Sequence, residues 1–220
     1  MTIKITDVTE EYLECIYRLQ QKRGVARTSE IVKMLQVAPG TVTNTIERLE
    51  RGGLILHEPY KGVTLTDEGG KIAIDVLRRH RLSERLLTDL LQVERDEAHK
   101  AACKLEHGLT EHVVAHLEKA LGYPKTCPHG NPIPTKRGII IEEQMILLTN
   151  LNEKEKGVVV KIELEDPKIL RFLYTLNLIP DTNIEIVETA PFDKPITIKS
   201  NGKLQKVRYD IASKIWIKKF

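Results

Sequence analysis

The chain of 220 residues is 41% hydrophobic and 30% charged, with a formal net charge of +3. This composition excludes a disordered or low-complexity chain, and the length suffices for one large domain or two small ones. The first residues, MTIKITDVTEEYLECIY, contain no apolar signal core, and no segment approaches the ~18 apolar residues of a membrane helix. Three widely separated cysteines indicate a reducing compartment. We therefore expect a cytoplasmic protein that does not associate with membranes.

The N-terminal quarter is locally basic and begins with a helix. Between Arg18 and Lys61 there are eight Lys or Arg residues and four Asp or Glu residues. This balance favours nucleic acid as a partner. Apolar residues recur at helical spacing over 7–22, and Gly24 is expected to end that helix.

Two shorter helices and a hairpin follow. Capping residues and apolar spacing predict helices over about 28–35 and 41–51, separated by the break APG. Two short helices joined by a tight turn are typical of a helix-turn-helix. The alternating segment LILHEPYKGVTLT adds a two-stranded hairpin with Tyr60 and Lys61 at its tip. Residues 1–66 are therefore predicted to form a winged helix-turn-helix DNA-binding domain.

The rest of the chain changes from helical to β patterning. Periodicity predicts helices over about 67–91, 94–107 and 110–121, and the Pro/Gly-rich connector GYPKTCPHGNPIPTKRG then marks a boundary. Six short, alternating segments beyond it predict the strands of a small barrel, with one short helix, DPKILRFLYTL, among them. We expect an α+β protein with a helical metal-binding and dimerisation domain at 67–138 and an SH3-like β-barrel at 139–220.

Potential metal ligands gather at helical spacing in the middle of the chain. They are His80 and Glu84 on one predicted helix, and His99, Cys103, Glu106 and His107 on the next. If the two helices pack with these faces together, their N, O and S atoms converge in a set that suits divalent Fe, Co, Mn, Ni or Zn. No C-x-x-C pair typical of structural zinc is present, which favours an open site for reversible sensing. For the triplet at 103–107 alone, a partly buried thiol beside a solvated Glu–His pair is the alternative.

Catalytic signatures are absent from the sequence: it holds no H-E-x-x-H, no P-loop and no G-x-G-x-x-G after a strand. We therefore expect that the protein is not an enzyme. Two alternatives remain open. A metal-independent winged-helix repressor would show no change in DNA affinity on chelation. A metalloenzyme with an accessory basic domain would show turnover without sequence-selective DNA binding.

The motifs HRLSERLLTD, ACKLEH and GNPIP, placed between a winged helix and a small barrel, resemble the diphtheria toxin repressor family of metal-dependent transcriptional regulators. The resemblance covers nearly the whole chain and is most specific at 9–19, 39–54, 78–91, 99–107 and 127–134. It is looser in the last domain, which resembles the SH3-like, FeoA-like domain of longer members. The resemblance implies two metal sites in each subunit, a homodimer and metal-gated binding to operator DNA.

The regulatory site implied by the resemblance consists of Glu11, Cys103, Glu106 and His107. Glu11 stands where iron-type members have a Met, so a carboxylate at this position resembles the manganese type. Cys103 instead resembles the iron type. The resemblance therefore leaves Fe²⁺ and Mn²⁺ as competing effectors.

The implied ancillary site consists of His80, Glu84 and His99. Iron-type members add a Glu and a Gln from the barrel. Approximate matching brings Glu165 or Asp166 near that Glu and places Ile169 on the Gln. An anion site beside the ancillary metal would match Arg81 and Asn131.

The DNA-contacting residues are expected on the second helix of the helix-turn-helix, next to it and on the wing. Thr methyl groups and Pro can contact thymine methyls, and an Asn can reach a base edge. Basic side chains would contact phosphates and make binding salt-dependent, although the same charges are also compatible with a solvated face. The set comprises Arg27, Thr28, Pro39, Thr41, Thr43, Asn44, Arg48, Arg51 and Lys61.

Other cysteine and histidine positions have simpler interpretations. His112 and His116 lie on an apolar helix that is expected at a dimer seam, with a structural or exposed role. Cys127 and His129, in CPHG, are expected to be structural because no partner pair is evident in the sequence. Cys15, beside apolar residues, is expected in the core.

The sequence thus favours a metal-dependent transcriptional repressor that binds double-stranded operator DNA as a homodimer and controls metal-uptake genes. Fe²⁺ is the first expectation because of Cys103 and the C-terminal barrel, and Mn²⁺ is next because of Glu11. Co²⁺, Ni²⁺ or Zn²⁺ can substitute in vitro on the same ligand chemistry.

Overall fold

The computed structural model describes residues 4–141, 144–163, 166–189 and 194–220. These residues belong to two compact units. The first contains Met1–His80, Leu105–Leu109 and Pro134–Ile139, and the second contains Arg81–Lys104, Thr110–Ile133 and Ile140–Phe220. No helix of the described residues is long and apolar enough to cross a membrane.

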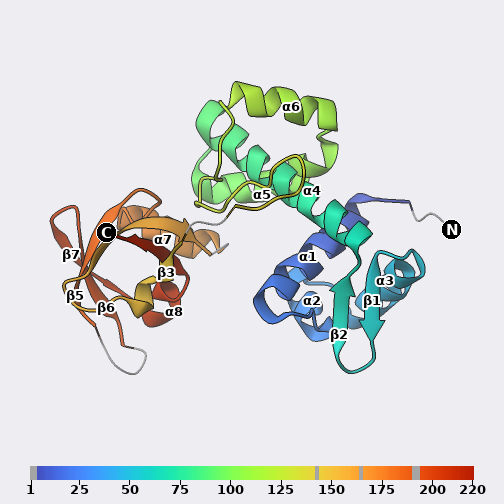
Figure 1. The fold of residues 1–220 in the computed structure, drawn as a ribbon, viewed down its shortest axis with the longest axis horizontal. Coiled ribbons are helices and arrows are strands. Elements are labelled where there is room, and N and C mark those ends of the chain that lie inside the picture. The colour runs from blue at the N-terminus through green and yellow to red at the C-terminus, as the bar shows by residue number, and fades with distance from the viewer. Residues whose placement is uncertain (1–3, 142–143, 164–165, 190–193) are drawn as a thin grey trace. The chain divides into compact units, whose positions relative to one another are not determined.

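The first unit begins with the expected helix-turn-helix (Figure 1). Its helices are α1 (Asp7–Arg23), α2 (Thr28–Leu35) and α3 (Pro39–Arg51). They pack around a shared apolar core that includes Leu13, Ile16, Ile31, Ile46 and Leu49. Helix α3 begins at Pro39, two residues before the predicted start, because a proline in the first helical turn has no amide hydrogen to leave unpaired.

The expected wing follows α3 directly. Strands β1 (Ile55–Glu58) and β2 (Gly62–Leu65) pair antiparallel, with Ile55 opposite Leu65 and Glu58 opposite Gly62. Two backbone hydrogen bonds of 2.9 and 2.8 Å between Ala26 and Val63 attach the hairpin to the start of the helix-turn-helix. The prediction of a winged helix is confirmed.

The next helices differ from the expected ones at their ends. They are α4 (Asp67–Arg85), α5 (Arg95–Leu105) and α6 (Glu111–Ala120). A single π-helical turn, η1 (Leu86–Leu90), continues α4 where a regular helix to 91 was predicted. The Thr88 hydroxyl donates to the Glu84 carbonyl at 3.0 Å, and this side-chain bond competes with the regular backbone ladder. After α5, the chain tightens into the 3₁₀ turn η2 (Glu106–Gly108).

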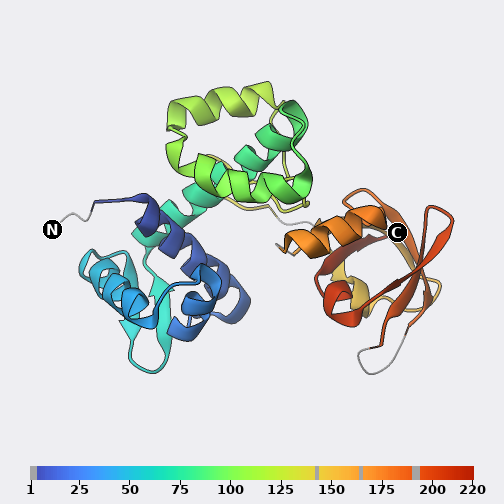
Figure 2. The ribbon, with the colours of Figure 1, turned by 180° about the vertical axis from the view of Figure 1, so that it is seen from behind.

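The C-terminal part is a six-stranded antiparallel sheet. In spatial order the strands are β3 (Ile146–Leu147), β8 (Ile215–Lys219), β4 (Lys156–Ile162), β5 (Asn183–Glu188), β6 (Ile196–Ser200) and β7 (Lys203–Val207). Helix α7 (Pro167–Thr175) contributes Leu170 and Leu173 to the core of this domain, and the short α8 (Tyr209–Ala212) contributes Ile211. Figure 2 shows both helices beside the sheet.

The expected barrel is not closed. Within the described residues, the edge strands β3 and β7 do not pair with each other. Strand β3 has only two residues before the chain turns into η3 (Leu148–Asn150), so it offers too short an edge to complete a ring. The strands and the helix were correctly predicted, whereas their closure into a barrel was wrong.

Candidate metal centre

Two imidazoles and two carboxylates meet where α1 and α4 contact the turn η2, all within the first compact unit. The Nδ1 atom of His107 lies 2.6 Å from Oε2 of Glu10, and Nδ1 of His80 lies 2.6 Å from Oε2 of Glu106. His107 Nε2 is 3.5 Å from Oε1 of Glu106. Glu106 and His80 are almost fully buried. Helix α5 ends at Leu105, so Glu106 and His107 stand on a 3₁₀ turn and not on the continuous helix that was predicted.

All three guanidinium nitrogens of Arg79 donate hydrogen bonds that hold these residues together. It donates from Nη2 to Oε1 of Glu10 at 2.6 Å and from Nη1 to the backbone carbonyl of Glu106 at 2.7 Å. Its Nε donates to Asp75 at 3.1 Å. Each donor thus fixes a different segment, and α1, α4 and η2 are positioned by one side chain. Neither Glu10 nor Arg79 was singled out from the sequence.

The local environment favours the neutral form of Glu106. Burial raises the pKa of Glu106, and the nearby Glu14 carboxylate raises it further, whereas the hydrogen bond and charge of His80 oppose the rise. A cation beside Glu106 would stabilise its charged form. The Glu106 carboxyl is therefore suited to release a proton when a metal ion binds beside it.

The other expected regulatory residues lie at the surface. Glu11 is exposed on α1, one residue beyond the Glu10 that contacts His107. Cys103 is exposed near the end of α5.

Of the expected ancillary residues, Glu84 and His99 lie beside the CPHG loop, for whose Cys127 and His129 the sequence predicts a structural role. In the second unit, Nδ1 of His99 lies 3.1 Å from Oε1 of Glu84, and Nδ1 of His129 lies 3.4 Å from the same oxygen. The Cys127 sulfur is 4.0 Å from His129 Nδ1. Glu84, Cys127 and His129 are all buried, and each offers a ligand atom within 4.8 Å of the others. Burial alone would lower the pKa of His129, but the Cys127 sulfur and the Glu84 carboxylate raise it to about 10.

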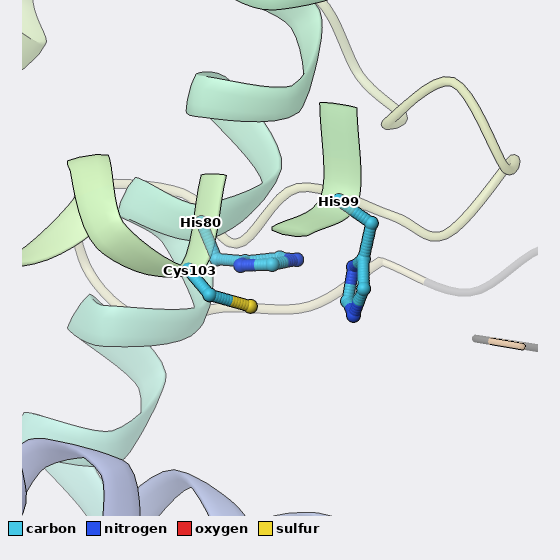
Figure 3. Close-up of side chains that lie close together, drawn as sticks. All are labelled: His80, His99 and Cys103. Atoms are coloured by element: carbon cyan, nitrogen blue, oxygen red, sulfur yellow. The ribbon is translucent and has the colours of Figure 1, made fainter. Parts of the chain in front are cut away.

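A further set of potential ligand atoms is drawn in Figure 3. His80 stands on α4, and His99 and Cys103 stand one helical turn apart on α5. Two imidazoles and a thiol are donors that suit first-row divalent metals.

The remaining expected site residues are placed as follows. Arg81 donates to the Pro132 carbonyl, and the Asn131 amide lies 3.8 Å from the Cys127 sulfur. Asp166 is exposed and caps α7 by accepting from the Lys168 amide at 2.8 Å. Glu165 lies outside the described residues.

The expected DNA-contacting residues form an exposed set on the first unit. Eight of the nine are exposed, and Thr28 is half-buried. They stand at the start of α2, on α3 and at the tip of the wing, while the apolar face of α3 is buried in the core. This face presents polar and basic side chains to solvent, as a DNA-reading surface requires.

The residues present are suited to a divalent metal. Among the described residues, the Nε2 atoms of His107 and His129 are buried without a hydrogen-bond partner. Buried polar atoms are normally paired, so such atoms beside carboxylates call for a ligand. Imidazole and carboxylate donors with a thiol in addition match Fe²⁺, Mn²⁺, Co²⁺ or Zn²⁺.

Three protein-family models match successive parts of the chain. The model described as "Iron dependent repressor, N-terminal DNA binding domain" matches residues 4–63. The model "Iron dependent repressor, metal binding and dimerisation domain" matches residues 66–135, and the FeoA domain matches residues 146–219.

Full-length relatives agree with these matches. The iron-dependent repressor IdeR of Mycobacterium leprae is 30% identical over 227 residues and covers 98% of each chain. The diphtheria toxin repressor of Corynebacterium diphtheriae is 30% identical over 220 residues and covers 97% of each chain.

Among solved structures, a manganese-dependent transcriptional repressor in complex with manganese superposes with a TM-score of 0.90 at 28% identity. The match covers 96% of this chain and 100% of that one. The repressor ScaR with bound Cd²⁺ superposes with a TM-score of 0.83 at 30% identity, covering 96% and 99% of the two chains.

Proposed function

Because this chain belongs to the diphtheria toxin repressor family of metal-dependent transcriptional repressors, we propose that it binds operator DNA when loaded with Fe²⁺ and controls metal-uptake genes. The contact between Glu10 and His107 carries the proposal, because it connects α1 of the winged helix to the turn that bears two expected ligands. The matched relatives are repressors, which supports a regulator and not an enzyme.

We assign the regulatory metal to Glu11, Cys103, Glu106 and His107. Glu10 accepts the Nδ1–H of His107, which leaves Nε2 of that ring as the atom available to a metal. A carboxylate that orients a ligating imidazole in this way also raises its basicity. In this assignment Glu10 is a positioning residue, and the neighbouring Glu11 is the ligand from α1.

A divalent ion held by these ligands would supply positive charge beside the buried carboxylate of Glu106. The protein's own residues couple metal binding to the position of α1 relative to η2. Glu10 and Arg79 hold α1 against η2, and α1 shares its core with α2 and α3. Stabilising the α1–η2 contact therefore stabilises one orientation of the reading helix α3. Metal raises DNA affinity only if it binds the DNA-competent orientation of α3 more tightly than the other orientations. DNA must then raise metal affinity by the same factor.

Operator DNA and a second copy of the chain are the proposed partners. The family model that matches 66–135 describes a dimerisation domain, and helix α6 within it exposes Val113. Helix-turn-helix dimers read half-sites about one helical turn apart or multiples of it, so we expect a pseudo-palindromic operator. Arg48, Arg51 and Lys61 would contact phosphates, and Asn44 would reach a base edge.

Manganese is the second candidate effector. Glu11 adds a hard carboxylate ligand, and a manganese-dependent repressor is among the similar structures. Fe²⁺ remains the first choice because the Cys103 thiolate is a softer ligand that favours Fe²⁺ over Mn²⁺.

Fluorescence anisotropy on the promoter region upstream of the protein's own gene tests the proposal. Anaerobic Fe²⁺, Mn²⁺ and Zn²⁺ are titrated at fixed salt, each against a chelator control. We expect a gain of about tenfold or more in DNA affinity, corresponding to ~1.4 kcal/mol, at lower Fe²⁺ than Mn²⁺ concentration. The reverse order would assign the protein to manganese. DNA binding that is unaffected by every metal and by chelation would overturn metal gating.

A further inference from the structure

The tip of the wing holds an aromatic residue in a backbone conformation that favours glycine. The turn over 58–61 is closed by the Lys61 amide, which donates to the Glu58 carbonyl at 3.1 Å. Tyr60 follows Pro59 in this turn and has φ +65°. A positive φ at the third residue of a turn is typical of type II, where glycine or asparagine is favoured because other side chains meet steric hindrance. A tyrosine at this position therefore costs free energy of folding.

Packing of the Tyr60 ring does not offset this cost. Tyr60 is fully exposed, at 109% of the reference area, so its ring is not buried against the described residues. Strained backbone that persists without a packing gain is a feature of binding sites, where it presents a side chain to a partner. A tyrosine offers a large, rigid and amphipathic contact area at a low cost in conformational entropy. Tyr60 therefore has the properties of a residue that contacts a binding partner.

The hairpin that carries Tyr60 is fixed to the helix-turn-helix within the first compact unit. On β1, the His57 amide donates to Oε1 of Glu50 on α3 at 3.2 Å. On β2, the Leu65 amide donates to the Gln20 side chain of α1 at 3.0 Å. These bonds hold the tip of the wing at a set position beside α3. When α3 lies in the major groove, a rigid projection beside it can reach the adjacent minor groove of the same duplex.

The chemistry of the tip suits the minor groove better than the phosphate backbone. Lys61 Nζ lies 2.6 Å from Oε2 of Glu58, and both side chains are exposed. This carboxylate weakens the attraction of the tip to phosphates. Tyr60 instead offers an apolar ring and a hydroxyl donor. In the minor groove, A·T pairs present only acceptors, namely adenine N3 and thymine O2, whereas G·C pairs add the 2-amino donor of guanine.

We propose that Tyr60 is a specificity-determining residue that enters the minor groove beside the base pairs contacted by α3 and favours A·T over G·C pairs there. The inference rests on the proposed binding of operator DNA, and it adds a preference outside the base pairs that Asn44 would reach. The ring would contact the walls of the groove, and the hydroxyl would donate to adenine N3 or thymine O2. Because both orientations of an A·T pair present these acceptors, the preference would be for A·T content and not for a particular base.

Base-analogue substitution in the DNA tests the proposal with the full-length protein. Hydroxyl-radical footprints of wild type and Tyr60→Gly, on the promoter region upstream of the protein's own gene, first locate the minor-groove positions whose protection depends on Tyr60. These positions are then filled with A·T, G·C or inosine·cytosine pairs, because inosine lacks the 2-amino group of guanine but keeps its major-groove acceptors. We expect wild type to bind the A·T and inosine·cytosine duplexes about fivefold or more tighter than the G·C duplex. Tyr60→Gly should bind all three duplexes equally.

Lys154→Gly is the matched control. Lys154 is exposed and has φ +68°, but it lies in the C-terminal domain, so this variant measures the effect of glycine at another left-handed position. It should leave the footprint and the three affinities unchanged. Because Tyr60→Gly removes an unburied side chain from a strained position, its urea midpoint by circular dichroism should stay close to that of the wild type.

Identical footprints for wild type and Tyr60→Gly would overturn the proposal. Equal weakening of wild-type binding by G·C and inosine·cytosine pairs would also overturn it, because only a major-groove contact treats these two pairs alike. The absence of any preference in wild type would reduce Tyr60 to a backbone contact. All comparisons are made both at saturating metal and with chelator. Wild-type DNA binding that does not respond to metal would contradict metal gating but leave the comparison at Tyr60 intact.

Discussion

His107 and Glu10 are joined by a 2.6 Å contact between Nδ1 and Oε2, although 97 residues separate them in the sequence. The other oxygen of Glu10 accepts from Arg79 at 2.6 Å. Glu10 is therefore held on both sides and cannot turn toward a metal without breaking an ion pair. Its geometry suits the orientation of a ligand better than ligation itself.

Substituting the two adjacent glutamates separates these roles. Glu11→Gln removes a proposed ligand, and we expect loss of metal-activated DNA binding at Fe²⁺ concentrations that saturate the wild type. Glu10→Gln leaves the ligands in place but weakens the orientation of His107, so we expect a metal affinity lower by about 10- to 100-fold with activation restored at high metal. Anisotropy titrations of Fe²⁺ at fixed DNA concentration measure both.

The opposite ranking would change the assignment. If Glu10→Gln abolishes activation at every metal concentration while Glu11→Gln resembles wild type, Glu10 is the ligand from α1. Arg208→Ala, which removes an exposed charge paired with Asp210 in the C-terminal domain, provides a control and should leave the titration unchanged.

The Cys103 thiol is expected to set both metal preference and pH dependence. A metal ion must displace the proton of the Cys103 thiol, so apparent metal affinity should fall as pH falls. Cys103→Ser should lower Fe²⁺ activation more than Mn²⁺ activation, because the thiolate favours the softer ion. It should also flatten the dependence of Fe²⁺ affinity on pH between pH ~6 and ~8, since one fewer proton is released. Equal losses for the two metals with an unchanged pH slope would show that Cys103 is not a ligand.

Local patterns in the sequence predicted the elements better than the contacts. The helix-turn-helix, the wing and the strands follow from apolar spacing and turn residues, which are local signals. Glu10 and Glu11 both carry a carboxylate near the start of α1. Glu10 differs because its carboxylate contacts Arg79, 69 residues away in the sequence. No local pattern contains that information.

The same reason explains two further differences. The sequence shows no partner near CPHG, and the structure places Glu84, which stands on α4 more than 40 residues earlier, beside His129. A small barrel was expected from short alternating strands, but closure depends on the length of the edge strand. Strand β3 ends after two residues because η3 follows it, which strand propensity does not reveal.

Substitutions on α3 distinguish residues that contact DNA phosphates from residues that recognise bases. Arg48→Ala should weaken binding about equally to all DNA sequences and reduce the slope of log affinity against log salt by about 1. Asn44→Ala should cost ~1–3 kcal/mol on the operator while leaving non-specific binding nearly unchanged. Both residues are exposed, so neither change should unfold the domain. Anisotropy over a salt series on operator and scrambled DNA measures these effects, and a sequence-dependent loss for Arg48→Ala would assign it to a base.

The turn at Gly130, in the CPHG segment, is expected to stabilise the C-terminal part of the chain. Gly130→Ala places a side chain in the left-handed region and against the Val160 carbonyl, so we expect destabilisation of ~1–3 kcal/mol from backbone strain alone. The single tryptophan, Trp216, stands on β8 beside β4 and reports unfolding of that sheet by fluorescence in urea. Gly40→Ala is the control, because Gly40 lies on α3 in the first unit with no atom within 4 Å of an added Cβ. It should leave the Trp216 transition in place, whereas Gly130→Ala should move it to lower urea. Coincident transitions for Gly130→Ala and wild type would mean that the turn does not support the sheet.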